Sequence, residues 1–277
     1  MFGEAHAHLF MNGYDYRKAV ETHKGHIEET VLRGYLEEYR KRGVIFIRDG
    51  GDDLGVSSFV KTIAPEYGID YRTPAFAIHK NGCYGSIVGK GFDTVKEYES
   101  LVLEAKKRGA DFIKLMVSGI VDFSRYGVIT STPLTREEMR EFFHIAHEKG
   151  MAVMVHANGA ETVRNAAECG ADSIEHGRYV DEEAIEAMAE YHTIWVPTVV
   201  TVRNLLGCGR FPDEIVKRLY EEDCRNLRLG KEKGAILGLG SDAGAYLVPH
   251  GKGIAECGRQ VQEADQRGRN DVVMSGD

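Results

Sequence analysis

Short apolar runs alternate with amphipathic stretches along almost the whole chain. Most of these runs are rich in β-branched residues and end at glycine or proline, and several are almost continuously apolar, which is typical of strands buried on both faces. The eight predicted strand segments are residues 1–10, 44–50, 71–79, 111–119, 151–159, 172–177, 194–201 and 235–244.

The stretches between these runs have the spacing of helices with one buried face. Residues 135–150 begin with a capping box formed by Thr135 and Glu138 and end at Gly150. Apolar residues recur at i, i+3, i+4 and i+7, or over a shorter version of that spacing, in three of the stretches. These stripes are Tyr98, Leu101, Val102 and Ala105; Met139, Phe142, Phe143 and Ala146; and Ala184, Ile185, Met188 and Ala189.

Eight strands that each precede a helical segment predict an α/β protein with the architecture of a (β/α)8 TIM barrel. The 277 residues suit such a barrel, which needs roughly 250. A doubly wound open sheet is the alternative. No low-complexity linker divides the chain, so we expect one domain over residues 1–263 and a polar C-terminal tail over residues 264–277.

Composition narrows the function classes. The 43 acidic residues outnumber the 35 basic ones, and no Lys/Arg stretch resembles a nucleic-acid footprint, so a nucleic-acid partner is disfavoured. The five cysteines form no CxxC pair, which argues against a disulfide framework and for a reducing compartment. We see neither a signal peptide nor an apolar segment of spanning length, and therefore predict a cytoplasmic protein with no membrane partner.

The predicted strand ends carry an unusual set of side chains. Barrel chemistry lies where the strands end, because the carboxyl ends of all eight strands meet at one face. Five of the eight strand segments end in groups that can bind metal or react: His6 and His8, Lys114, His156, His176 and Asp242. His6 and His8, two residues apart in one strand, point to the same face and can converge on one ion.

Each of these residues also has an ordinary structural explanation. Two alternating histidines occur on exposed strand edges, a single buried histidine is often only a core residue, and Asp242 could cap a helix. Lys114 lies between Ile113 and Leu115 in a buried strand, so its ammonium must be paired, neutral or modified. A salt bridge to a carboxylate such as Asp242 is the structural explanation, and a reactive amine is the chemical one. The occurrence of all six residues together at the ends of predicted strands is what favours a metal-binding or catalytic site over these separate structural explanations.

This order of residues resembles the amidohydrolase superfamily. The family pattern places HxH on the first strand, Lys on the fourth, His on the fifth and sixth, and Asp on the eighth. The segments "DFIKLMVSG", "IAHEKGMAVMVHANG" and "GADSIEHG" are similar to the imidazolonepropionase-like or Xaa-Pro dipeptidase-like branch. The resemblance runs from about residue 3 to about residue 254.

The resemblance implies a binuclear metal centre. His6, His8 and Asp242 would bind one divalent transition-metal ion, zinc being the first choice, and His156 and His176 the other. Lys114, carbamylated by carbon dioxide, would bridge the two ions. A metal-bound hydroxide would then attack an amide or peptide-like C–N bond, with Asp242 as the catalytic proton carrier. Imidazolonepropionase lacks the strand-four lysine, so Lys114 favours the dipeptidase-like members.

The expected substrate is a small molecule such as a dipeptide or an N-acyl amino acid. His79, Tyr84 and Arg178 are the predicted substrate-binding residues, and Arg48 and Arg203 are further candidates for a substrate carboxylate. For the arginines a surface salt bridge is the simpler reading. A homo-oligomer is compatible with the sequence.

Other functions on the same barrel stay open. A lactonase or a deaminase would use the same ligands, a Schiff-base aldolase would use Lys114 as its nucleophile, and a non-catalytic binding protein would keep only the scaffold. Family members usually carry a small β-sandwich built from both ends of the chain. With five residues before His6 and about 35 after Asp242, we expect that sandwich to be largely absent, as in a minimal barrel or a truncated chain.

Overall fold

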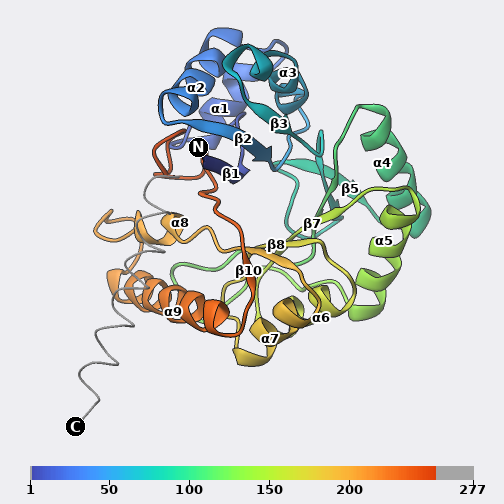
Figure 1. The fold of residues 1–277 in the computed structure, drawn as a ribbon, viewed down its shortest axis with the longest axis vertical. Helices are drawn as coiled ribbons and strands as arrows, with labels where there is room; N and C mark the ends of the chain where they lie inside the picture. Colours follow the sequence, from blue (N-terminus) through green and yellow to red (C-terminus); the bar gives the residue numbers. More distant parts are fainter. Residues whose placement is uncertain (1, 254–277) are drawn as a thin grey trace.

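The structure, a computed structural model, describes residues 2–253, with the strands at the centre and the helices around them (Figure 1). The strands are β1 (Phe2–Ala7), β2 (Val44–Asp49), β3 (Asp70–Arg72), β4 (Ala77–Lys80), β5 (Gly89–Phe92), β6 (Ile113–Met116), β7 (Val153–Ala157), β8 (Ser173–His176), β9 (Ile194–Val196) and β10 (Ile236–Leu237). The helices are α1 (Tyr16–His23), α2 (Glu29–Lys41), α3 (Val56–Ile63), the 3-10 helix η1 (Ala64–Tyr67), α4 (Val95–Lys107), α5 (Arg136–Glu148), α6 (Ala160–Glu168), α7 (Glu182–Glu190), α8 (Val200–Arg203) and α9 (Asp213–Glu232). The predicted tail, residues 264–277, and the predicted domain end at residue 263 lie outside the described residues.

The strands pair in parallel, as predicted, and every predicted run contains a strand. Hydrogen bonds group them into a three-stranded sheet, β1-β2-β3, and a seven-stranded sheet, β10-β9-β8-β7-β6-β4-β5. Strand β5, a short glycine-containing segment outside β4, was not predicted. The α/β fold with eight barrel strand positions is confirmed, and helices separate most neighbouring positions.

Backbone contacts join the two sheets on one side. The chain after β10 runs beside β1, where Asp242 N donates to His6 O at 2.7 Å and His8 N donates to Ala243 O at 2.7 Å. On the other side the predicted third strand, residues 71–79, is two strands rather than one. Between them Pro74 has no amide hydrogen to donate and Ala75 has a φ of 65°, so the ladder is interrupted there and the hydrogen-bonded barrel is not closed.

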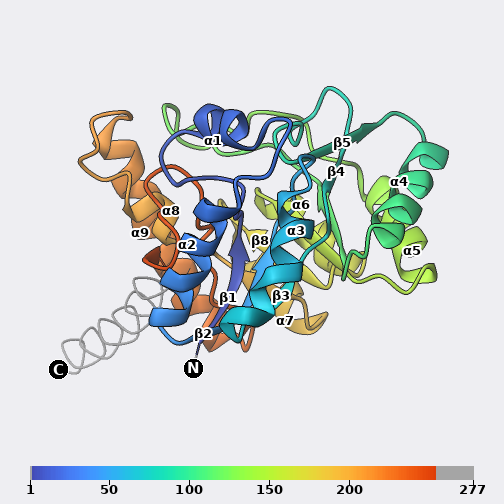
Figure 2. The ribbon, with the colours of Figure 1, turned by 90° about the horizontal axis from the view of Figure 1, so that it is seen from above.

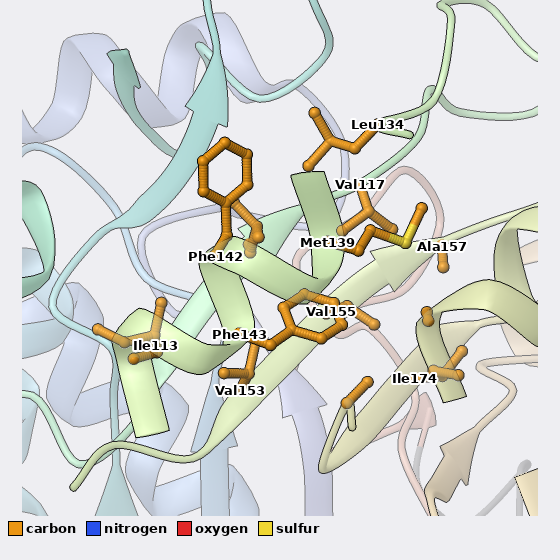
Figure 3. Close-up of a cluster of buried hydrophobic side chains, with 14 of the residues drawn as sticks. Ile113, Val117, Leu134, Met139, Phe142, Phe143, Val153, Val155, Ala157 and Ile174 are labelled. Atoms are coloured by element: carbon orange, nitrogen blue, oxygen red, sulfur yellow. The ribbon is translucent and has the colours of Figure 1, made fainter. Parts of the chain in front are cut away.

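The largest apolar core lies between the strands and the helices that cover them. Helix α5 begins at the predicted capping box, with both Thr135–Glu138 hydrogen bonds present. Figure 3 shows Phe143 of this helix beside Val153 and Val155 of β7, all fully buried. Burial of such a side chain stabilises the fold by about 1.5–3 kcal/mol. In α7 the buried stripe includes Ala187 rather than the predicted Ala189.

One end of the strands is covered by loops and by α1. Figure 2 shows α1 at the end of β1 opposite the N-terminus, which is the end where the parallel strands finish. Tyr16 and Arg17 of this helix line a cavity at that end. Within residues 2–253, no helix combines the length and apolar content needed to cross a membrane.

Candidate functional site

All six side chains predicted to bind metal line one cavity of about 630 Å³ at the carboxyl ends of the strands. They come from five places in the sequence that the parallel strands bring together. These side chains are His6, His8, Lys114, His156, His176 and Asp242.

Three of these residues already form a group with the spacing of metal ligands. Asp242 Oδ1 lies 3.6 Å from His6 Nε2 and 3.9 Å from His8 Nε2. One ligand atom from each residue lies within 4.8 Å of the other two. Histidine nitrogen and carboxylate oxygen are ligands that zinc accepts.

The other two histidines extend the group. The ring centroid of His176 lies 4.6 Å from that of His156 and 5.1 Å from that of His6. Lys114 in β6 is 1% exposed and lines the same cavity. The imidazoles therefore face one space from three strands, which is the arrangement that a pair of ions needs.

Each of the four imidazoles has one ring nitrogen held by the protein, which leaves the other for a ligand. Metal-binding histidines are fixed in this way, because a hydrogen bond to one nitrogen sets the tautomer and orientation of the ring. The contacts are His6 Nδ1 to Glu175 Oε2 at 2.6 Å, His8 Nδ1 to Gly51 O at 3.3 Å, His156 Nε2 to Gly119 O at 3.1 Å, and His176 Nδ1 to Thr198 Oγ1 at 2.8 Å.

Glu175 is itself held in place by a buried ionic network. Arg48 of β2 donates to Glu175 Oε1 at 2.6 Å and to Ser173 Oγ at 2.9 Å, and Ser173 Oγ donates to Glu175 Oε1 at 2.8 Å. Arg48 therefore forms a largely buried salt bridge rather than a surface one: it reaches from β2 in one sheet to β8 in the other, and it lines neither this cavity nor the smaller one described below. Its role is to hold the carboxylate that orients His6.

Two buried polar atoms at the centre of the site have no hydrogen-bond partner among the described residues. They are His6 Nε2 and Lys114 Nζ. Within residues 2–253 the salt bridge considered for Lys114 is not formed, since no carboxylate of this part of the chain lies within bonding distance of its ammonium. An unpaired buried polar atom costs free energy, so these two atoms fit a site completed by bound cations and by modification of the lysine.

Burial shifts the pKa of these groups towards their neutral forms. Desolvation lowers the pKa of Lys114 to about 8, and it lowers the pKa of His8 and of His156 to about 3, with the charge of Lys114 acting in the same direction on both rings. It raises the pKa of Asp242 to about 7, against the charge of Lys114. Neutral imidazoles and a nucleophilic amine are the forms that bind metal and carbon dioxide.

The backbone at three of these strand ends adopts the left-handed conformation, which is uncommon for residues other than glycine. His176 has a φ of 68°, Thr198 of 47° and Asp242 of 57°. Such conformations are unfavourable and cluster at functional sites. Of these three residues, His176 and Asp242 line the cavity, and the hydroxyl of Thr198 contacts the His176 ring.

The predicted substrate-binding residues lie in different places relative to the cavity. Tyr84 lines the cavity, and its ring centroid lies 5.0 Å from that of His156. Arg178 lines an adjoining cavity of about 280 Å³. His79 is not among the residues lining either cavity: its Nδ1 faces the Lys80 carbonyl oxygen at 3.0 Å, and the backbone at Gly85 passes close to its Cβ. Arg203 is exposed and also lines neither cavity.

Our sequence reasoning missed several residues of the site. Glu175 carried a signal, because a glutamate inside a buried strand must have a partner. Arg210 and Tyr246, which line both cavities, carried none, because they lie in loops whose course the sequence pattern does not predict.

Comparison with known proteins places this arrangement in a family. An uncharacterized protein of Mycobacterium tuberculosis (strain ATCC 25618 / H37Rv) is 27% identical over 173 residues, which are 58% of this chain and 45% of that protein. The match thus spans less than half of the curated relative.

Solved structures share the fold. A Xaa-Pro dipeptidase with bound methionine in the active site superposes with a TM-score of 0.74 at 24% identity, over 95% of this chain and 70% of that one. A prolidase complexed with N-methylphosphonate-L-proline gives a TM-score of 0.73 at 23% identity, over 89% of this chain and 66% of that one. The model of the amidohydrolase family matches residues 2–268, so this chain belongs to the amidohydrolase family.

Proposed function

We propose that this chain is a metal-dependent hydrolase that cleaves an amide or peptide-like C–N bond of a small substrate. The observation that carries the proposal is the set of four imidazoles, each with one nitrogen held by the protein and the other turned to a shared cavity beside Lys114 and Asp242. Membership of the amidohydrolase family supports it, as do the dipeptidase and the prolidase with the same fold.

The side chains divide into two ligand sets. His6, His8 and Asp242, whose ligand atoms already lie close together, would hold one divalent transition-metal ion, with zinc the first choice. His156 and His176 would hold the other, and Lys114 as its carbamate would lie between them. When bound, the ions polarise the substrate carbonyl and lower the pKa of water towards neutrality.

The chain itself supplies position and proton transfer. Glu175, Thr198 and the carbonyl groups fix the rings, so the ligand geometry does not relax during turnover. Asp242 is the proton carrier: it accepts a proton from the attacking water and donates it to the leaving nitrogen, and its burial, which raises the pKa of the carboxyl, favours this proton uptake. No serine or cysteine nucleophile is needed.

The expected partner is a small-molecule substrate, a dipeptide or an N-acyl amino acid, rather than nucleic acid or a membrane. A cytoplasmic location and a homo-oligomeric state remain predictions.

The test is hydrolysis by the purified protein of a panel of dipeptides, N-acyl amino acids and lactones, before and after dialysis against a chelator. We expect amide hydrolysis that the chelator abolishes and added zinc restores. Asp242→Asn should lower kcat by about 100-fold or more, because general acid–base catalysis is worth that much. Asp15→Asn is the matched control, since Asp15 lines the same cavity and asparagine can keep its N-cap of α1.

Three results would contradict the proposal. One is amide hydrolysis that survives metal removal, a second is selective hydrolysis of the lactones, and the third is borohydride trapping of a keto substrate on Lys114, which would identify a Schiff-base enzyme.

A further inference from the structure

The smaller cavity of about 280 Å³ adjoins the site and opens onto the same catalytic groups. We refer to it as the side compartment. His156, His176 and Asp242 line both cavities, as do Tyr84 and Arg210. A substrate whose scissile bond lies beside His176 and Asp242 can therefore extend one branch into each cavity.

Apolar side chains form one wall of the side compartment. They come from the loop after β6 and from the segment between α8 and α9: Val121, Phe123, Leu205 and Phe211. The rings of Phe123 and Phe211 lie 5.3 Å apart, and Val121 and Leu205 are buried. An apolar wall of this kind selects an apolar group by desolvation.

Arg210 stands where the two cavities meet. Its guanidinium carbon lies 4.6 Å from the ring centroid of Tyr246 and 5.2 Å from that of Phe211. Arg210 is solvent-exposed, and within residues 2–253 its guanidinium has neither an ion pair nor a hydrogen bond, so it packs on these rings with its charge not neutralised by the protein. A guanidinium held in this way in a cavity wall is suited to a ligand carboxylate.

Arg178, the arginine that we predicted for this role, is already engaged. Its Nη2 donates to Thr198 O at 3.3 Å and to Thr201 Oγ1 at 2.5 Å, and its Nε lies 3.6 Å from the buried carboxylate of Asp223. Its Nη2 is therefore held by protein oxygens and its guanidinium is paired with Asp223, although the Nε itself makes no hydrogen bond within the described residues. Arg210 is the better anion anchor of the two.

We propose that the leaving half of the substrate is an α-amino acid with a bulky apolar side chain, whose side chain enters the side compartment and whose carboxylate binds Arg210. The reason is that Phe211 is shared: it forms part of the apolar wall and lies under the guanidinium, so the two subsites are adjacent. In an α-amino acid the side chain, the carboxylate and the nitrogen share one carbon. The acyl half then lies in the larger cavity. This inference deepens the proposed function and rests on it for the identity of the scissile bond.

The test measures binding of the leaving product, which requires no turnover. Dissociation constants of L-phenylalanine, L-phenylalaninamide and L-alanine are determined for the full chain, as purified with its metal, by ligand-observed NMR titration. The wild type should bind L-phenylalanine more tightly than either other ligand. Arg210→Gln should weaken L-phenylalanine binding roughly 10- to 100-fold, as loss of charged hydrogen bonds does, and leave the amide unchanged. Arg203→Gln, at the end of α8 and outside both cavities, should change neither constant.

A second pair of variants tests the side compartment. Phe123→Ala should reduce the preference for L-phenylalanine over L-alanine at least about fivefold, because apolar contact area is lost. Ile87→Ala, which changes an apolar residue of the larger cavity only, should keep that preference. Equal binding of acid and amide by the wild type, or equal effects of Arg210→Gln and Arg203→Gln, would overturn the proposal. If the wild type and the variants bind these ligands as predicted but the protein hydrolyses no amide, the proposed function is refuted and the binding site for the amino acid is retained.

Discussion

Replacing Lys114 with methionine should stabilise the metal-free protein while removing its capacity for the second metal ion. Lys114 is 1% exposed, its Nζ has no hydrogen-bond partner within the described residues, and burial lowers its pKa from 10.5 to about 8. Methionine has a similar length and no charge, so it fills the same space without the cost of a buried ammonium.

The size of the effect follows from the pKa. A pKa difference of one unit corresponds to about 1.4 kcal/mol, so a fall from 10.5 to about 8 makes the protonated lysine cost about 3 kcal/mol in the fold. Because the unfolded chain holds this proton more tightly, the cost is fully present below pH 8 and disappears as the pH rises to 10.5. Lys114→Met should therefore be about 3 kcal/mol more stable than the wild type at pH 7, and the difference should shrink above pH 8.

The assay is urea unfolding of both proteins, stripped of metal in buffer free of carbon dioxide, between pH 7 and pH 10. Lys107→Met is the control, since Lys107 is exposed and its replacement should change the free energy of unfolding by less than about 0.5 kcal/mol. Adding zinc and bicarbonate should reverse the order of stability, because only the wild type gains the full binding energy of both ions. A metal-free Lys114→Met protein less stable than the wild type at pH 7 would refute the idea that this amine is held unpaired for modification.

Three further perturbations test the site and its surroundings. Glu175→Gln should weaken zinc binding about 10- to 100-fold in a chelator competition titration, because His6 loses its anionic partner. The control Glu190→Gln, at an exposed position, should have no effect, and equal zinc affinities of the two variants would exclude the orienting role of Glu175. Gly50→Ala should also weaken zinc binding, because the new Cβ would lie 2.2 Å from His8 Cε1, and unchanged zinc affinity would show that His8 is not held there. The control Gly34→Ala in α2, with open space around it, should keep the metal and raise the free energy of unfolding by about 0.5–1 kcal/mol. Burial lowers the pKa of His250 to about 4, so as the pH falls below 6.5 the unfolded chain binds a proton at this ring before the folded chain does, and stability is lost. In urea unfolding the wild type should lose about 2 kcal/mol relative to His250→Gln between pH 6.5 and pH 5, and an equal pH dependence of the two proteins would refute this.

The parallel fold was predictable because its strands are buried on both faces. An almost continuously apolar run such as residues 153–157, preceded by a capped amphipathic helix, has few other stable arrangements. The split of the third strand was harder to predict. Pro74 was a visible signal inside that run, but the loss of pairing also depends on the conformation of Ala75 and on distant partners.

The metal-binding candidates were predictable for a geometric reason. Residues at the ends of parallel strands must meet at one face, so His6, His156 and His176 converge although they lie far apart in the chain. The contacts that orient these rings were not predictable. Glu175 carried a signal as a buried glutamate, but its pairing with Arg48 joins β8 to β2 through the interior, and the sequence pattern does not report which strands face each other there.

The positions of the residues proposed to bind substrate were the least predictable part of the site. His79 lies at a strand end, as predicted, yet the chain at Gly85 and Gly91 approaches its side chain closely and it does not line the cavity. Arg210 lies in a loop, and only the packing of its guanidinium on two rings places it in the wall of the cavity. Loop conformation decides such contacts, and hydrophobic periodicity does not report it.

The most direct test of the account is the number of zinc ions that the full chain retains, measured by elemental mass spectrometry after reconstitution in bicarbonate and removal of loosely bound metal. The account predicts close to two ions for the wild type and at most one for Lys114→Met and for His156→Ala. A folded wild type that retains no zinc, or a Lys114→Met protein that retains as much as the wild type, would contradict it.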